Sequence, residues 1–169
     1  MLILPIASYL SSGWMIGWAS APYNSTWAEK YPKRAALMAM AGPAANFAIA
    51  FLSWCGLKLG LLAGLFVPGD AWRFSNTVVS VEPGIWTPVA VLLSIAFSLN
   101  TLLGVFNLLP LPPLDGGALP LFFLDDERAR NYHRFSRSAA PAFLGLIVAW
   151  QFFPRIYRPV FYWLESTLQ

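Results

Sequence analysis

Long apolar runs alternate along the chain with stretches that carry charge. The four runs are Leu2–Ala19, Ala35–Leu57 with an extension past Lys58 to Phe66, Ile85–Leu109, and Ala139–Phe153. A helix needs roughly 20 apolar residues to cross a bilayer core about 30 Å thick, because it rises about 1.5 Å per residue. The pattern therefore predicts a polytopic bundle of membrane helices with about four apolar segments.

The first and fourth runs each allow two interpretations. The first could be a signal peptide, since Ala19-Ser20-Ala21 resembles a cleavage site, but no Lys or Arg precedes its apolar core and a retained membrane helix is favoured. The fourth run has only fifteen residues, so it is either a short span or a re-entrant segment. The tail Pro154–Leu168 mixes arginine with aromatic residues, which predicts an amphipathic helix at the membrane interface.

Positive charge is concentrated in two of the connections between the runs. Lys and Arg number three in residues 20–34, one in 67–84, four in 118–138 and two in 154–169. Because cytoplasmic loops carry an excess of Lys and Arg, the first and third connections are predicted to face the cytoplasm, and both chain termini the opposite side. The third connection contains a short apolar piece, Ala118–Leu124, and a charged segment, Asp125–Arg137, which we place at the membrane surface.

The composition indicates the same class of protein. The chain is 57% apolar and 11% charged, whereas about a quarter of the residues of a soluble domain are charged. The eleven Lys and Arg lie almost entirely outside the apolar runs, and they form no basic stripe that would predict nucleic-acid binding. We therefore expect one all-α membrane domain over residues 1–169, in contact with lipid.

Cysteine and histidine are scarce. The chain has a single cysteine, Cys55, which lies inside an apolar run. One cysteine can form neither an internal disulfide nor a thiolate zinc cluster. The single histidine, His133, lies among Arg130, Arg134 and Arg137, so we expect it to be a solvated surface residue.

The most informative stretch ends the third run, where the sequence from Phe106 to Gly117 reads F-N-L-L-P-L-P-P-L-D-G-G. Three prolines in four residues remove backbone donors and break the helix, which leaves carbonyl groups to be satisfied by protein or by a wet cavity. Asp115 follows this break. Its carboxylate is either a functional group in an enclosed polar site or the cap of a helix that starts near Gly116.

Two motifs, in this order, resemble a known family. Ala41–Asn46 reads A-G-P-A-A-N and resembles the A-G-P-x-x-N element of the site-2 proteases, zinc metalloproteases that cut within the membrane. N-x-x-P-x-P-P-L-D-G-G closely resembles their second signature. Gly17-Trp18-Ala19, followed by Pro22 and Asn24, looks like a degraded segment of the bacterial branch without PDZ domains. The resemblance is strong from Ala35 to Gly117 and weak beyond it.

The resemblance implies roles for three residues. Asp115 matches the third zinc ligand of the family, and Asn107 matches the asparagine that handles the substrate backbone. Asn46 is implied as a further substrate contact, although an asparagine in a membrane helix often only bonds a neighbouring helix, which contributes about 1 kcal/mol. The 169 residues then resemble the carboxyl-terminal part of a site-2 protease core.

The first signature of the family, H-E-x-x-H, does not occur in the sequence. Two histidines and a glutamate of that signature bind zinc and activate water, so we expect this chain alone to be inactive and not to retain zinc. Two explanations stay open: a chain that is incomplete at its amino terminus, or a true zinc-free pseudoprotease. Ala118, where relatives often have arginine, and Pro120 depart from the family pattern and support the second.

The function implied by the resemblance is that of an intramembrane zinc metalloendopeptidase, which hydrolyses peptide bonds of membrane-embedded substrates. The alternative is a non-catalytic scaffold that binds a transmembrane partner helix. In both cases the expected partners are membrane lipid and a transmembrane protein, and not nucleic acid. The expected location is multi-pass in the bacterial inner (cytoplasmic) membrane.

Overall fold

The computed structural model describes residues 25–69 and 74–168, and most of these residues are helical. Its helices are α2 (Ser25–Lys30), α3 (Pro32–Leu62), α4 (Trp86–Asn107), α5 (Asp126–Ser136), α6 (Ala139–Ser166) and the 3-10 helix η1 (Asp115–Phe122). The predicted all-α class is thereby confirmed. The first apolar run, Leu2–Ala19, and the segment from Gly17 to Asn24 lie outside the described residues.

Among the described residues, α3, α4 and α6 are long and apolar enough to cross a membrane. They have 31, 22 and 28 residues, and each contains a window of 18 residues with mean hydropathy of at least 1.3. The helix α3 begins with Pro32, which is tolerated there because the backbone N–H that proline lacks would have no partner inside the helix. The length and apolar composition of the three helices identify the chain as an integral membrane protein.

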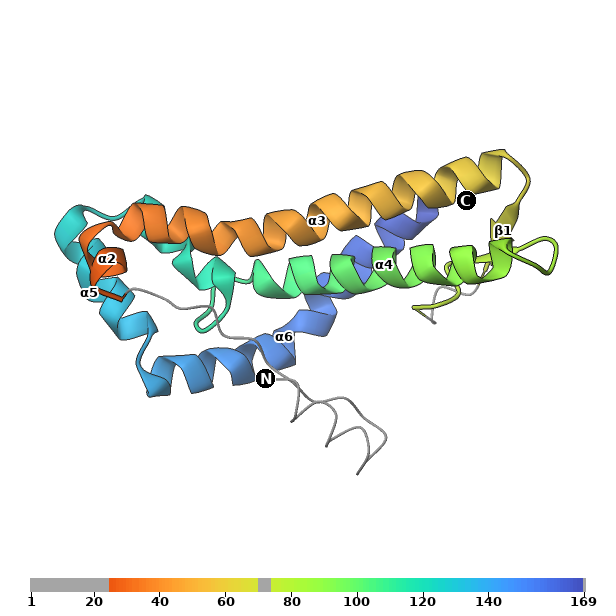
Figure 1. Cartoon of the computed structure of the whole chain (residues 1–169). Coiled ribbons are helices and arrows are strands. Elements are labelled where there is room, and N and C mark those ends of the chain that lie inside the picture. Colours follow the sequence, from red (N-terminus) through yellow and green to blue (C-terminus); the bar gives the residue numbers. More distant parts are fainter. Residues whose placement is uncertain (1–24, 70–73, 169) are drawn as a thin grey trace, which may run out of the picture.

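The helices α3 and α4 lie side by side and antiparallel, and α6 crosses them on one side (Figure 1). Small residues allow α3 and α4 to approach closely, since a Cβ on Gly104 would lie 3.0 Å from the ring of Phe47, and one on Gly56 would lie 3.2 Å from Leu93. The elements α2, η1 and α5 gather at one end of the molecule, and the end of α6 lies at the other (Figure 1). We call the first of these ends the polar end.

A short antiparallel hairpin joins α3 to α4, in a region that the sequence analysis treated as a loop. Strand β1 (Phe66–Pro68) pairs with β2 (Val78–Ser80), with Val67 opposite Val79. One side of the hairpin is buried with α3, α4 and α6 in a core of Leu57, Phe66, Val78, Ala90, Phe97, Phe161 and Leu168. The hairpin therefore closes the end of the bundle opposite the polar end.

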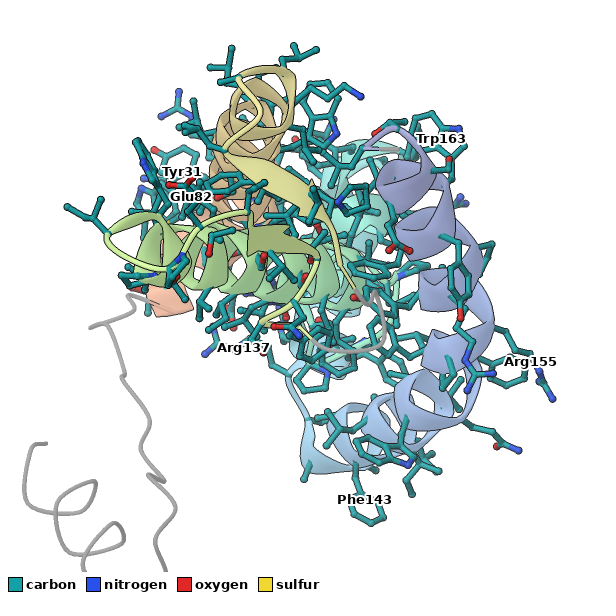
Figure 2. All side chains as sticks on the ribbon, turned by 90° about the vertical axis from the view of Figure 1, so that its right-hand side faces the viewer. Tyr31, Glu82, Arg137, Phe143, Arg155 and Trp163 are labelled. Carbon is teal, nitrogen blue, oxygen red and sulfur yellow. The ribbon has the colours of Figure 1, made fainter. Side chains whose placement is uncertain are left out.

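The structure corrects the prediction for the carboxyl-terminal part of the chain. The fourth apolar run and the tail were predicted as a short or re-entrant segment and a separate interfacial helix, but they form the single helix α6. Pro154 and Pro159 lie inside it without ending it. Phe143 and Arg155 lie at the outer edge of α6 and point away from the other helices (Figure 2).

Packing against α4 and α3 explains why α6 continues through its prolines. Phe153, Tyr157 and Phe161 recur every four residues, and their rings stack at centroid distances of 5.2 and 5.3 Å. Phe153 also contacts Phe106 of α4 at 5.2 Å, and Phe161 contacts Phe97 at 6.0 Å. This aromatic row stabilises the half of α6 that the sequence suggested would lie at the interface.

The last turn of α6 is tied to α3 by two hydrogen bonds. Trp54 Nε1 donates to Thr167 Oγ1 over 2.8 Å, and Lys58 Nζ donates to the Thr167 carbonyl over 2.7 Å. A cation is favourable there, because the final carbonyls of a helix carry partial negative charge. The end of α6 is thus fixed beside the carboxyl-terminal half of α3.

We predict that topology reporters will follow this arrangement. A reporter fused after Arg34 or Arg128 should lie in the cytoplasm, whereas one fused after Gly69 or after the last residue should lie on the opposite side. The last fusion tests α6, since 28 helical residues extend about 42 Å and exceed a hydrocarbon core of about 30 Å. Alkaline phosphatase and fluorescent-protein fusions measure both compartments. A carboxyl-terminal reporter on the same side as the Arg128 fusion would mean that α6 does not span.

Candidate functional site

The helix break predicted at the proline cluster is present. The helix α4 ends at Asn107, and regular structure resumes only with η1 at Asp115. In between, the backbone closes on itself through short bonds: Leu111 N–H donates to the Leu109 carbonyl over 2.8 Å, and Leu114 N–H to the Leu111 carbonyl over 2.9 Å. These seven residues, 108–114, are called the proline turn below.

The proline turn packs closely against backbone that contains glycine. A Cβ on Gly116 would collide with the Leu108 carbonyl, and a Cβ on Gly145 of α6 would collide with the Pro112 carbonyl. A Cβ on Gly117 would lie 2.9 Å from the backbone nitrogen of Pro112. Close approach of main chains therefore requires glycine here, and it packs one side of the turn against η1 and α6.

The structure tests one of the two interpretations of Asp115, that of a helix cap. Asp115 is the first residue of η1, Leu114 occupies the capping position, and no side chain caps this helix. The carboxylate instead faces α3, where its Oδ2 would lie 2.8 Å from a Cβ added to Gly42. Within the described part of the chain, no hydrogen bond or ion pair reaches this carboxylate. The capping interpretation is therefore wrong.

A cavity of about 620 Å³ lies where α3, the proline turn, η1, α5 and α6 meet. Its wall on α3 is formed by small and apolar residues: Ala35, Met38, Ala39 and Gly42. Asp115 lines it from η1, and His133, Ser136 and Arg137 line it from α5. Burial raises the pKa of the Asp115 carboxyl above its usual value of 3.8, because water is partly excluded from the charged form.

The histidine was placed wrongly by the sequence analysis. His133 is only 7% exposed and lies on the cavity, rather than on the solvated face of α5. Burial lowers the pKa of its imidazole, the positive charge of Arg137 lowers it further, and the negative charge of Glu29 opposes the shift. His133 is therefore predominantly neutral at pH 7.

The helix α5 is attached directly to the D-G-G turn. The hydroxyl of Tyr132 donates a hydrogen bond of 2.8 Å to the Gly117 carbonyl. Ala129 of α5 packs with Leu121 of η1 and Ala36 of α3 in a small buried core. The backbone at Gly117, two residues after Asp115, is thus held by α5. The backbone at Gly116 packs against Leu108, directly after the end of α4. The sequence did not predict the contact with α5, because Tyr132 and His133 lie in a short charged segment that carries no recognised motif.

The two asparagines do not line this cavity. Asn107 is the last residue of α4 and is half-buried, and Asn46 is half-buried on α3, one turn beyond Gly42. Asn46 lies on α3 at the height of the last turns of α4, since the ring of the neighbouring Phe47 lies against Gly104 of α4. Neither asparagine makes a hydrogen bond to another helix within the residues described. The structure therefore brings Asp115 to the cavity and leaves both asparagines outside its lining.

The described residues do not make a complete metal site. No group of three His, Cys, Asp or Glu side chains that could hold a metal ion occurs among residues 25–69 and 74–168. A catalytic zinc site normally has three protein ligands and one open position. Asp115 can supply one of them, as a partly buried carboxylate without a protein partner in the part of the chain described.

The comparison with protein families agrees with this geometry. The model for peptidase family M50 matches residues 7–149, a stretch that includes α3, the proline turn, Asp115 and α5. No curated protein and no solved structure matches the chain.

We predict that Gly116→Ala destabilises the bundle strongly. The added methyl group would meet the Leu108 carbonyl, which is main chain and cannot rotate away, so the cost should be about 2 kcal/mol or more. Thermal unfolding in detergent measures the effect. Gly56→Ala is the matched control, because its methyl group would meet only the flexible side chain of Leu93. Equal unfolding midpoints for the two variants would contradict the packing of the proline turn.

We predict a pH-dependent contribution of Asp115 to stability. Its pKa is raised in the folded state, so the unfolded chain releases the proton more readily. The free energy of unfolding should therefore fall as pH rises from about 3.8 through the raised pKa, and it should stay lower above that range. Asp115→Asn should remove this step and be at least as stable as the parent at pH 7. Parallel stability curves for the two proteins would mean that the carboxylate is solvated.

Proposed function

The chain belongs to peptidase family M50, and we propose that it forms the part of an intramembrane zinc endopeptidase that contains the third metal ligand. In this proposal the 169 residues are a single membrane domain that resembles the carboxyl-terminal part of the protease core. The observation that carries the proposal is the placement of Asp115, whose carboxylate faces a cavity beside α3 with no partner among the described residues.

The proposed metal ligand is Asp115. A carboxylate oxygen is a suitable zinc ligand, and Gly42 leaves space in front of it where any larger residue would intrude. Bound zinc would lower the pKa of its water toward about 7 and polarise a peptide carbonyl. The two glycines after Asp115 and the hydrogen bond from Tyr132 would hold the aspartate in one position, as a metal ligand requires.

Asn107 and Asn46 are proposed as contacts to the substrate chain. Asn46 lies four residues beyond Gly42 on α3, which is about 6 Å along the helix axis. Amide side chains in that position can donate to and accept from an extended polypeptide backbone. Asn107, directly before the helix break, would play the catalytic role that the family resemblance assigns to it.

The second candidate function is a non-catalytic scaffold that binds a transmembrane helix in the same cavity. The observation that favours it is that the sequence contains one histidine and no H-E-x-x-H motif. In the scaffold, Asp115 and the asparagines would bind a partner without cleaving it. The two functions differ in one requirement, because only the peptidase needs two further ligands from outside these residues.

For either function we propose a location in the bacterial inner membrane, with the polar end in the cytoplasm. Seven of the eleven Lys and Arg lie in or beside α2 and α5, which meet at that end (Figure 1). Membrane lipid would cover the exposed apolar faces of α3 and α6.

We predict that zinc binding depends on Asp115 and on a supplied H-E-x-x-H helix. The 169-residue chain, purified in detergent and dialysed against chelator, should retain little zinc. When the H-E-x-x-H segment of a family member is fused before it, about one zinc per chain should be retained. In that fusion, Asp115→Asn should reduce metal retention and peptide cleavage by about tenfold or more. Elemental analysis measures the metal.

The matched control is Glu82→Gln, which changes an exposed carboxylate far from the cavity and should leave zinc retention unchanged. Gly42→Ala is a second test, because its methyl group would displace the Asp115 carboxylate while the helix α3 is kept. Stoichiometric zinc in the chain without the added segment would contradict the ligand assignment. A fusion that binds zinc but cleaves no membrane peptide would favour the scaffold.

A further inference from the structure

Another cavity lies toward the end of the bundle that the hairpin closes, and the proposed peptidase function does not use it. It is a cleft of about 320 Å³ between α3 and α6. The helix α3 lines it with residues between Phe47 and Trp54, α4 with Phe97 and Thr101, and α6 with its last turns. Phe51 and Trp163 on its rims are 61% and 67% exposed, so the cleft opens toward lipid.

The polar side chains inside the cleft are already bonded within the protein. The hydroxyl of Thr101 donates to a carbonyl one turn earlier in α4, and that of Thr167 donates within α6 and accepts from Trp54 Nε1. Among the described lining side chains, only the indole N–H of Trp163, on the exposed rim, has no such partner. The cleft therefore suits a hydrocarbon chain better than an extended polypeptide, whose backbone groups would need hydrogen-bond partners.

The dimensions of the cleft match one acyl chain. The helix α3 rises about 10 Å from Phe47 to Trp54 and about 16 Å from Phe47 to Lys58. One leaflet of a hydrocarbon core about 30 Å thick measures about 15 Å, so the cleft and Lys58 together extend over the depth of one leaflet. A helix about 10 Å across and about 10 Å long would occupy roughly 800 Å³, so a transmembrane helix could insert only side chains into this volume.

A cation lies at the end of the cleft. Phe47, Phe51, Trp54 and Lys58 follow one another at spacings of four, three and four residues, so they share one face of α3. Lys58 is half-buried, and its Nζ donates to the Thr167 carbonyl over 2.7 Å, which uses one of the three N–H donors of an ammonium group. No carboxylate within residues 25–69 and 74–168 forms an ion pair with it. A charge at this depth is unfavourable without an anionic partner.

We propose that the cleft binds one phospholipid, with an acyl chain between α3 and α6 and its phosphate group at Lys58. Lysine binds phosphate as a point charge, and basic groups between membrane helices recognise lipid headgroups in this way. The indole N–H of Trp163 would donate at the same headgroup layer. Glu165, in the last turns of α6, does not line the cleft. The inference is independent of the metal site, which lies at the polar end.

The chain offers matched variants for both parts of the lipid. Lys58→Gln removes the charge and keeps an N–H donor for the Thr167 carbonyl. Its control is Arg155→Gln, because Arg155 points away from the other helices (Figure 2). Ala50→Leu places a larger side chain in the cleft, since Ala50 lines it and is only 6% exposed. Its control is Ala48→Leu, two residues away on α3, because Ala48 is exposed and does not line the cleft.

Native mass spectrometry of the full chain, released from detergent, measures the affinity for two lipids with identical acyl chains, phosphatidylglycerol and an uncharged glycosyl diacylglycerol. One phosphatidylglycerol should bind per chain, about tenfold more tightly than the glycolipid. Lys58→Gln should remove most of this difference, whereas Lys58→Arg and Arg155→Gln should preserve it. Ala50→Leu should weaken the binding of both lipids, and Ala48→Leu should weaken neither. Thermal unfolding checks that each variant is folded.

Several results would overturn the proposal. Equal affinity of the two lipids for the parent chain would exclude the phosphate contact. Loss of the difference in Arg155→Gln as well as in Lys58→Gln would mean that the effect comes from the overall charge of the chain. Unchanged binding of both lipids to Ala50→Leu would place the acyl chain elsewhere. A dimer in the mass spectrum that Ala50→Leu dissociates would assign the cleft to a second copy of the chain, and displacement of the lipid by an apolar helical peptide would assign it to a transmembrane partner.

Discussion

Close main-chain packing around the proline turn is the constraint on which the placement of Asp115 depends. After Asn107 the helix stops, and the carbonyl groups of the following residues have no partners of the helical kind. The chain meets this constraint by main-chain packing, with Gly116 against the Leu108 carbonyl and Gly145 of α6 against the Pro112 carbonyl. The proline turn, the start of η1 and the distant helix α6 are thus brought together at one point, and Asp115 lies beside it.

The two ends of the bundle use different means to reach stability. At the hairpin end, buried rings and aliphatic side chains of α3, α4 and α6 form a core, and the last turn of α6 is fixed by Trp54 and Lys58. At the polar end the buried core is small, and short contacts between backbone atoms and a hydrogen bond from Tyr132 replace it. A site that has to admit a ligand is better placed at the second end, where a cavity interrupts the packing.

Sequence patterns predicted the parts of the fold that depend on local chemistry. The spans α3 and α4 followed from uninterrupted apolar runs, and the break before Asp115 followed from three prolines. The continuity of α6 could not be predicted, because Pro154 and Pro159 argue locally for an interruption and only contacts of Phe153 and Phe161 with α4 outweigh them.

His133 was misplaced for a similar reason. The three arginines close to it in sequence suggested a solvated position, but α5 turns the His133 side chain inward, while the adjacent Arg134 stays exposed. The family resemblance could not correct this, since it was strong only as far as Gly117. The position of Asp115 was predictable because a motif marked it; the wall opposite was not, because it depends on how α5 packs against η1 and α3.

The state of the Asp115 carboxylate is informative about the proposed function. A partly buried carboxylate without a hydrogen bond or ion pair from the described residues is unfavourable for folding, because it loses hydration and gains no partner. Structural carboxylates in such surroundings usually acquire a donor, but the hydroxyl of Tyr132 on α5 bonds to the Gly117 carbonyl instead. The backbone next to Asp115 is held by neighbouring elements, while its carboxylate oxygens have no partner among the described residues. Such an arrangement is typical of a residue that binds a ligand. Membership of a zinc peptidase family identifies the kind of ligand that would complete it.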